Sequence, residues 1–193
     1  MIWRRSGLRL VIHDTSRTPL RQVEGRHAQH YFTGLQYERL FKPLPPTISD
    51  DTAFHDRWAA YLPGWELPKL TPDMLTPHVG FILDYTSEIF HRELRRIGSY
   101  GALWERWFAS PLGQWSAHDL RSINRTFSGL TKLIFPSGVL EKEDARLLLR
   151  LAIELRLRVL VQLHIMNEQE FHVTELSFRD RETGEMEVVR VEV

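Results

Sequence analysis

The sequence contains no cysteine among its 193 residues. This absence excludes a disulfide framework, a thiolate zinc site and a cysteine nucleophile. The sequence also has no apolar run near the roughly 18 residues that a membrane helix needs, because the apolar piece from Leu8 to Ile12 ends at His13. We therefore expect neither a signal peptide nor a membrane anchor, and we expect a cytoplasmic location.

Neither sign of charge is in excess, since 25 basic and 25 acidic residues cancel to a formal net charge of zero. The overall field therefore supplies no attraction for nucleic acid, and any such role needs a local basic patch. A hydrophobic content of 42% with 26% charged residues is typical of a soluble globular protein.

The common catalytic signatures are missing as well. There is no G-x-x-x-x-G-K-[ST] phosphate loop, no G-x-S-x-G elbow and no H-E-x-x-H motif, which disfavours independent nucleotide binding, hydrolase chemistry and zinc-protease chemistry. His27 and His30 lie three residues apart, but without a nearby carboxylate ligand they are more typical of solvent-exposed histidines than of a metal site. We predict no metal site and a chain that is not a complete enzyme by itself.

What the sequence does contain is a series of amphipathic helix patterns. Apolar spacing predicts a helix from about Val79 to Ile97, a second that starts at the cap residue Ser116 and ends at Pro136, and a third from about Glu141 to Met166. The aromatic segment YGALWERWFAS predicts a shorter helix that Pro111 closes. On the third long helix, Arg150, Glu154 and Arg158 form an i, i+4 ladder.

Two further segments lie before and after these helices in the sequence. Residues 41–51 hold three prolines in four positions, which predicts an extended connector. The short helix in AFHDRWAAYL has Asp50 or Asp51 as its cap and carries Asp56 and Arg57 just ahead of a Pro-Gly-Trp turn. At the other end, alternating valines and the turn signal ETGE predict a β-hairpin.

Together these patterns predict a mainly α-helical fold in four parts. We expect a poorly defined N-terminal segment at residues 1–40, the connector and short helix at 41–70, a helical domain at 71–166 and the hairpin at 167–193.

Two arginines are candidate functional residues. Arg57 precedes a rigid turn, from which a guanidinium can project across a subunit boundary toward a phosphate, although spacing alone favours an ion pair with Asp56 or Asp51 on a solvated face. Arg121 lies near the start of its helix, where exposed amides and the helix dipole favour an anion. Its plainer alternative is a surface arginine near Asp119.

Five segments follow one another in a specific order along the chain: LFKPLP, DTAFHDRWAAYLPGWELPKL, GFILDYTSEIFHRELR, INRTFSGLTKLIFP and LAIELRLRVLVQL. In this order they resemble the C-terminal part of the BrxL-like family, the Lon-related AAA+ ATPases of BREX phage-defence systems, also described as Lon-like proteases. The resemblance runs from about Tyr37 to the end of the chain and includes FRDRETGE.

The resemblance implies an incomplete AAA+ core followed by a helical lid-like bundle and the hairpin. AFHDRW resembles an arginine-finger segment, so Arg57 would reach the nucleotide bound by the next subunit. LRSINRTFSG resembles the sensor-2 helix, which places Arg121, or alternatively Arg125, near the phosphates of its own subunit. Fixed guanidinium groups stabilise charge on a transferred phosphoryl group without reorganisation.

The family implies ATP with Mg²⁺ as the cofactor, which we expect this chain not to bind alone. It implies homologous AAA+ subunits in a ring, or a split N-terminal half, as partners, and DNA binding by resemblance only. We therefore expect a truncated BrxL-like ATPase that supplies Arg57 and the sensor-2-like arginines but lacks the Walker motifs. The alternatives are a non-catalytic interaction module docking on a full-length or split partner, and a remnant without function.

Overall fold

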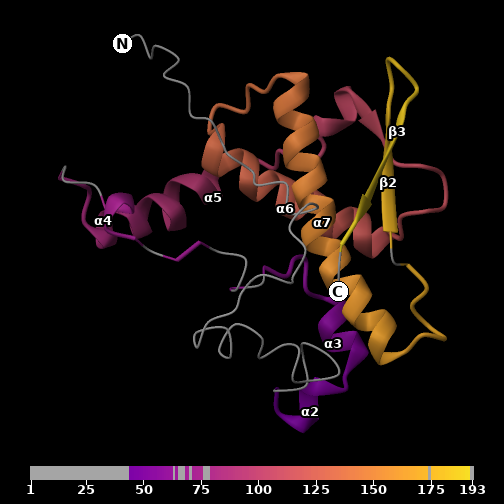
Figure 1. Cartoon of the computed structure of the whole chain (residues 1–193). Helices are drawn as coiled ribbons and strands as arrows, with labels where there is room; N and C mark the ends of the chain where they lie inside the picture. The colour runs from indigo at the N-terminus through magenta and orange to yellow at the C-terminus, as the bar shows by residue number, and fades with distance from the viewer. Residues whose placement is uncertain are drawn as a thin grey trace.

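The structure is a computed structural model that describes residues 44–62, 64, 68–69, 71–75, 79–173 and 175–191. Helices dominate this part of the chain, and a three-stranded antiparallel sheet forms near its C-terminal end (Figure 1). This arrangement confirms the mainly α-helical fold class. The apolar piece at Leu8–Ile12 and the histidines at positions 27 and 30 lie outside the described residues.

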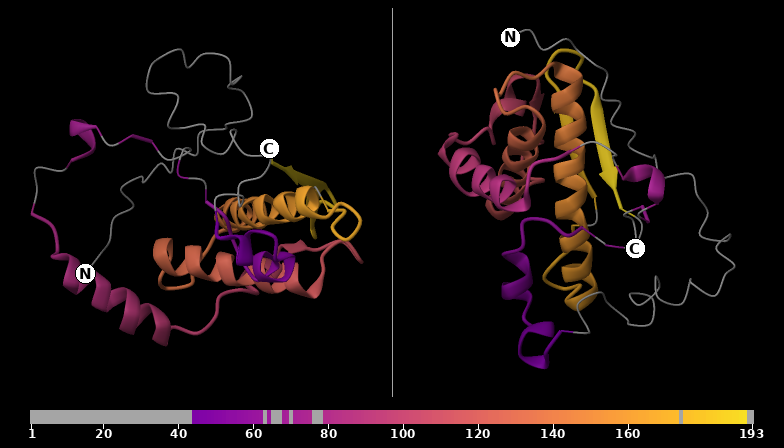
Figure 2. Two further views of the ribbon diagram at one scale, coloured as in Figure 1. Left: turned by 90° about the horizontal axis from the view of Figure 1, so that it is seen from below. Right: turned by 90° about the vertical axis from the view of Figure 1, so that its left-hand side faces the viewer.

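Helix α7 (Lys142–Met166) is the centre of the fold, and α6 (Ala117–Ile134) packs along it (Figures 1 and 2). The two helices confirm the second and third predicted long helices. Ile123 and Phe127 of α6 are fully buried in the same apolar cluster as the leucines of α7. Because α3, α6 and the sheet each contact α7, its apolar circumference is covered almost all the way round.

The sheet contains β1 (Phe108–Ala109), β2 (Glu175–Asp180) and β3 (Met186–Arg190) in that order. The predicted hairpin is thus confirmed as β2 and β3, in which Leu176 pairs with Val189. Its inner side chains join the core cluster against α7, which stabilises a hairpin that would be marginal alone.

The third strand comes from the segment predicted as an aromatic helix, and that prediction is wrong beyond Arg106. Only the 3₁₀ helix η5 (Leu103–Arg106) forms, and the chain then becomes extended at Phe108. The reason is tertiary, because Phe108 is fully buried and pairs with Asp180 of β2. Trp104 is held in place by a hydrogen bond from its indole Nε1 to Asn124 Oδ1 at 2.8 Å.

The predicted extended connector is wrong over α2 (Pro46–Ser49), a single helical turn. Helix α3 (Thr52–Asp56) is also shorter than the apolar pattern predicts. It ends early because the backbone beyond it bonds to α7 instead, with Tyr61 N–H donating to the Leu155 carbonyl at 3.0 Å. A 3₁₀ turn, η3 (Pro72–Met74), follows in the connection to the next helix.

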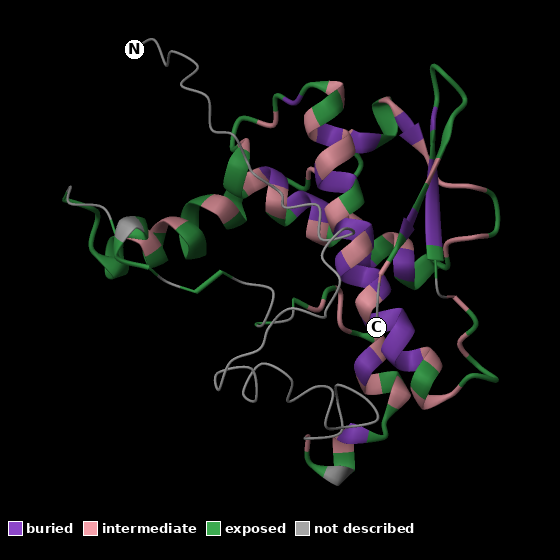
Figure 3. Ribbon diagram, in the orientation of Figure 1, coloured by how far each residue is buried: buried purple, intermediate pink, exposed green. Residues whose placement is uncertain are grey.

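The first predicted long helix is present as three consecutive pieces, α4 (Leu83–Glu88), the π-helical η4 (Ile89–Glu93) and α5 (Leu94–Arg96). It begins later than the pattern indicated and projects from the other helices (Figures 1 and 2). Most of its surface and of the approach to it is exposed (Figure 3). The apolar strip, as we call its exposed apolar residues, consists of Val79, Phe81, Ile82, Leu83, Tyr85 and Phe90.

Candidate functional site

Arg57 is the C-cap residue that directly follows α3, and its side chain is exposed. The two carboxylates that spacing offered as its partners have other roles. Asp51 caps α3 by accepting a hydrogen bond from Phe54 N–H at 3.0 Å, and Asp56 pairs elsewhere. Within the described part of the chain Arg57 therefore has no ion-pair partner, and its guanidinium is presented to solvent.

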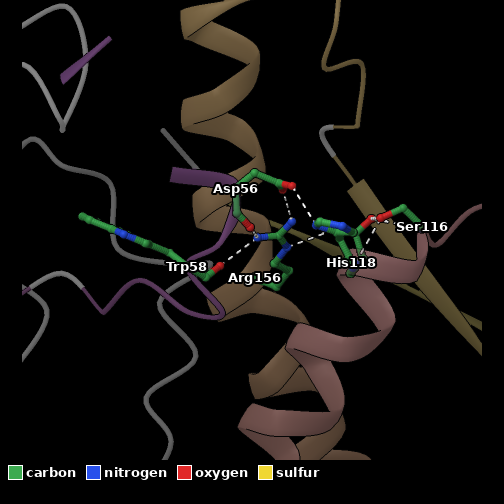
Figure 4. A network of polar contacts seen from close by, with 6 residues as sticks. Asp56, Trp58, Ser116, His118 and Arg156 are labelled. Carbon is green, nitrogen blue, oxygen red and sulfur yellow. Dashed lines mark hydrogen bonds and ion pairs between the residues drawn. The ribbon is translucent and has the colours of Figure 1, made fainter. Parts of the chain in front are cut away.

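Asp56 is held by Arg156, a fully buried arginine of α7 (Figure 4). The guanidinium donates to Asp56 Oδ1 at 2.5 Å, to the Asp56 carbonyl at 2.9 Å and to the Trp58 carbonyl at 2.8 Å. Its Nε donates to Asp119 Oδ1 of α6 at 2.9 Å. We call this set of bonds the Arg156 clamp, because one side chain joins α3, α6 and α7.

The same clamp includes the start of α6. Asp119 Oδ2 accepts bonds from the Ser116 hydroxyl at 2.6 Å and the Ser116 N–H at 3.1 Å, and Asp119 N–H donates back to the Ser116 hydroxyl. This capping box confirms Ser116 as the predicted cap. His118 Nδ1 lies 3.0 Å from Asp56 Oδ2, so α3 contacts the first turn of α6 directly (Figure 4).

Sequence reasoning missed Arg156. The ladder it identified on α7 is confirmed at Arg158 and Glu154, whose side chains are 2.7 Å apart. Arg156 is two residues from Arg158 and therefore on the opposite side of the helix, among the apolar residues. A charged residue on an otherwise apolar face is the signal that could have found it, because burying a charge requires partners.

Arg121 and Arg125 both line one groove of about 680 Å³ between α6 and the end of α5. Arg95 and Lys132 line it too, so four cations share one opening. No carboxylate lines this groove among the residues the structure describes. The donor set therefore fits phosphate groups of a nucleotide, and the described lining supplies no carboxylate ligand for Mg²⁺.

Asp180 lies at a second cavity, of about 410 Å³, beside the sheet. Its Oδ2 is 2.9 Å from Lys142 Nζ and 3.0 Å from Arg146, while its Oδ1 accepts the N–H groups of Glu182 and Thr183 in the β2–β3 turn. The hydrogen bond from Lys142 is the main cause that lowers the Asp180 pKa to about 2. This carboxylate is fully engaged in holding the turn against α7 and is not available as a general base.

The described ranges contain neither a cluster of metal-ligating side chains nor a membrane-spanning helix. No group of three or more potential metal ligands occurs there. Nor does any helix in that part of the chain have the length and apolar content to cross a membrane.

Comparison with known proteins identifies what the chain is similar to. Residues 24–177 match the family described as "Lon-like protease BrxL-like, ATPase domain". Two curated proteins named Lon-like protease BrxL, from Bacillus cereus (strain H3081.97) and Escherichia coli O9:H4 (strain HS), are each 39% identical over 159 and 163 residues. These alignments cover 81% and 83% of this chain but 23% of each relative. The chain thus spans less than a quarter of the length of these relatives.

Proposed function

The chain belongs to the BrxL-like ATPase family, and from this premise we propose that it works as part of an AAA+ ATPase whose nucleotide it helps to hydrolyse. In this proposal Arg57 acts in trans as an arginine finger on the nucleotide of a neighbouring subunit. Arg121 and Arg125 contact the phosphates of the nucleotide in the same subunit, in the manner of sensor-2 residues.

One observation carries the proposal: Arg57 is exposed, without an ion pair in the described chain, on a backbone that the Arg156 clamp holds. The clamp bonds to the carbonyls of Asp56 and Trp58, the residues on either side of Arg57. A fixed backbone with a solvent-facing guanidinium suits a residue that must stabilise charge on a transferred phosphoryl group, because little reorganisation is then needed.

ATP is the substrate that this proposal requires, and Mg²⁺ its companion ion. The groove cations Arg121 and Arg125 would bind phosphate oxygens. The phosphate loop and the Mg²⁺ ligands would come from ATPase-domain sequence beyond the match to this chain, which covers only 23% of each relative. Such sequence would belong either to the same polypeptide or to a separate partner.

At the level of the cell, we propose a role in BREX anti-phage defence, in the cytoplasm, as part of a ring of homologous subunits that acts on DNA. What supports this role is membership of the BrxL-like family together with the segments that carry the resemblance. The relatives' name also includes a Lon-like protease, and we propose no peptidase activity for the residues of this chain.

A second candidate function, a non-catalytic interaction module, is favoured by the apolar strip. Phe81 is 80% and Leu83 85% exposed, and aromatic and aliphatic groups gathered on one projecting segment are typical of a contact surface. In that case the chain docks on a full-length or split ATPase and supplies Arg57 in trans to the nucleotide of that ATPase.

The proposal is tested by transplanting this chain into the Escherichia coli relative in place of the matching 163 residues. We expect ATP turnover by the chimera, and Arg57→Ala should lower kcat on the order of 10³-fold, the lower end for arginine fingers. Arg150→Ala, which removes another exposed arginine, should change kcat by less than about twofold. Turnover by Arg57→Ala above about a tenth of the unsubstituted chimera would refute the finger role.

The chain alone should show no ATP turnover, and mixing separates the two candidate functions. If the wild-type chain co-elutes with a full-length relative and changes its ATPase rate only when Arg57 is present, the interaction module acts in trans. If it neither co-elutes nor changes the rate, the module is excluded and the remnant without function gains support.

A further inference from the structure

The groove between α5 and α6 brings together cations that have no ion-pair partner among the residues that the structure describes. Arg92 and Arg96, the neighbours of Arg95 on the projecting helix, pair with Glu88 and Glu93 at 3.0 and 3.6 Å. Arg95, which lines the groove, makes no ion pair with any described residue, and the same holds for the other three groove cations. On the projecting helix, the arginines outside the groove thus form ion pairs, whereas the cations that line the groove form none with a described residue.

The nearest carboxylate on the same helix does not neutralise them. Asp119 precedes Arg121 by two residues, but it is 3% exposed and engaged by Arg156 and Ser116. The groove therefore keeps a local positive potential in a chain whose net charge is zero. This is the local basic patch that the composition alone could not show.

Gly129 adds an independent observation. It lies in the interior of α6, where glycine is among the least favourable residues, and it lines the groove. A Cβ built at this position meets nothing within 4 Å, so packing does not require a glycine there. Gly98, which follows the C-cap residue of α5 and also lines the groove, is equally open. Close approach of a ligand to the backbone is one use of glycine, and it fits an open position on a helix face such as Gly129.

The groove residues of α6 form a row along the helix. Arg121, Arg125, Gly129 and Lys132 follow one another by four, four and three residues and therefore share one face. The row extends over about 16 Å along the helix axis. A single phosphate could contact only part of such a row, whereas a chain of phosphate groups could contact all of it.

We propose that this groove binds a chain of phosphate groups laid along α6, with Arg95 and Lys132 as additional binding residues and Gly129 as the point of closest approach. The inference rests on the proposed function in taking phosphate as the ligand of Arg121 and Arg125. It goes beyond that function in giving the chain an anion site of its own, independent of a phosphate loop.

The test is direct binding to the full chain of 193 residues, measured by calorimetry at low salt with inorganic tripolyphosphate and with orthophosphate. Tripolyphosphate should bind at least about tenfold more tightly than orthophosphate. Arg95→Gln and Lys132→Gln should each lower the affinity for tripolyphosphate about three- to tenfold. The control Arg150→Gln on α7 should change this affinity by less than about twofold.

Gly129→Ala separates a binding role from a structural one. Because alanine favours the helix and meets no neighbour, the melting temperature should rise by about 2–4 °C. The added methyl group should nevertheless lower the affinity for tripolyphosphate by at least about threefold, because it occupies the space through which the ligand would approach the backbone. A purely structural effect would move stability and binding in the same direction.

An oligothymidylate of about 12 nucleotides distinguishes the two sources of a phosphate chain, a nucleoside triphosphate and a nucleic-acid backbone. If the groove takes a nucleic-acid backbone, the oligonucleotide binds more tightly than tripolyphosphate, and each cation removed lowers the slope of log affinity against log salt by about 0.7. If the groove takes a nucleotide, tripolyphosphate and ATP bind more tightly than the oligonucleotide.

The inference is overturned if neither probe binds, if orthophosphate binds as tightly as tripolyphosphate, or if Arg95→Gln and Lys132→Gln leave affinity unchanged. These results are separate from the test of the proposed function, which depends on Arg57 and on turnover in the chimera. A chimera insensitive to Arg57→Ala, with binding still dependent on Lys132, would refute the finger and leave the groove in place.

Discussion

Replacing Arg156 by methionine should undock α3 and lower the stability of the whole fold. Methionine keeps most of the length of the side chain but removes the guanidinium, so the change isolates the polar bonds of the clamp from its packing. Four acceptors lose their donor: the carbonyls of Asp56 and Trp58, the buried Asp119 Oδ1, and Asp56 Oδ1. The Asp56 carboxylate is partly exposed and can bond to water instead, so the two carbonyls and Asp119 dominate the cost.

The magnitude follows from those acceptors. Each neutral carbonyl bond contributes about 1 kcal/mol and the bond to the buried carboxylate about 1.5–3 kcal/mol, so Arg156→Met should cost about 3–5 kcal/mol. Asp56→Ala should cost less, about 1–3 kcal/mol, because Arg156 then keeps Asp119 and both carbonyls. For a chain of this length the larger loss corresponds to a fall of about 6–20 °C in the melting temperature.

The assay is urea unfolding followed by circular dichroism, with Arg150→Met as the matched control on the same helix. Arg150 is exposed, so its replacement should change the free energy of unfolding by less than about 0.5 kcal/mol. Limited proteolysis of Arg156→Met should also give early cleavage near Arg57. If Arg156→Met and Arg150→Met unfold at the same urea concentration, the clamp contributes nothing and the fixed placement of Arg57 loses its basis.

Two further predictions concern the sheet and the loop after α6. The folded-state pKa of Asp180, about 2, is lower than its ordinary 3.8, so its stabilising effect is present above about pH 4 and is lost as the pH falls toward 2. Asp180→Asn should flatten this acid dependence in urea titrations between about pH 5 and pH 2, and an unchanged pH profile would contradict the pairing with Lys142. Gly138 has φ +70° and a Cβ there would lie 2.8 Å from the Tyr100 ring. Gly138→Ala should therefore cost at least about 1 kcal/mol more than Gly184→Ala, where φ is +77° but space is open; equal melting temperatures would refute the clash.

Local sequence patterns were sufficient to predict the long helices. The start of α6 was predictable because Ser116 and Asp119 are only three residues apart, and a capping box is a local hydrogen-bond arrangement. The π-helical step at Ile89–Glu93 has no local signal of this kind. The early end of α3 and the conversion of residues 108–109 to strand escaped prediction because the bonds responsible reach α7 and β2.

The candidate site also contains residues that the sequence predicted and a grouping that it did not. Arg57 and Arg121 were singled out from their positions beside a rigid turn and near a helix start. The family segments then assigned their roles and added Arg125, and these catalytic roles stay predictions. The grouping of Arg121 and Arg125 with Arg95 and Lys132 was not predictable, because Arg95 lies 26 residues before Arg121 in the sequence and only the fold brings α5 beside α6.

By itself, the sequence determined the helical class, the caps, the hairpin and the resemblance to the BrxL-like family, because all of these are encoded in spacings of a few residues or in contiguous segments. The tertiary structure decided which charges are buried and which face solvent. Asp56 and Arg57 are adjacent in sequence, yet Asp56 bonds to Arg156, one hundred residues away, while Arg57 remains exposed. A buried guanidinium needs acceptors from several elements at once, and only the packing of α3, α6 and α7 supplies them.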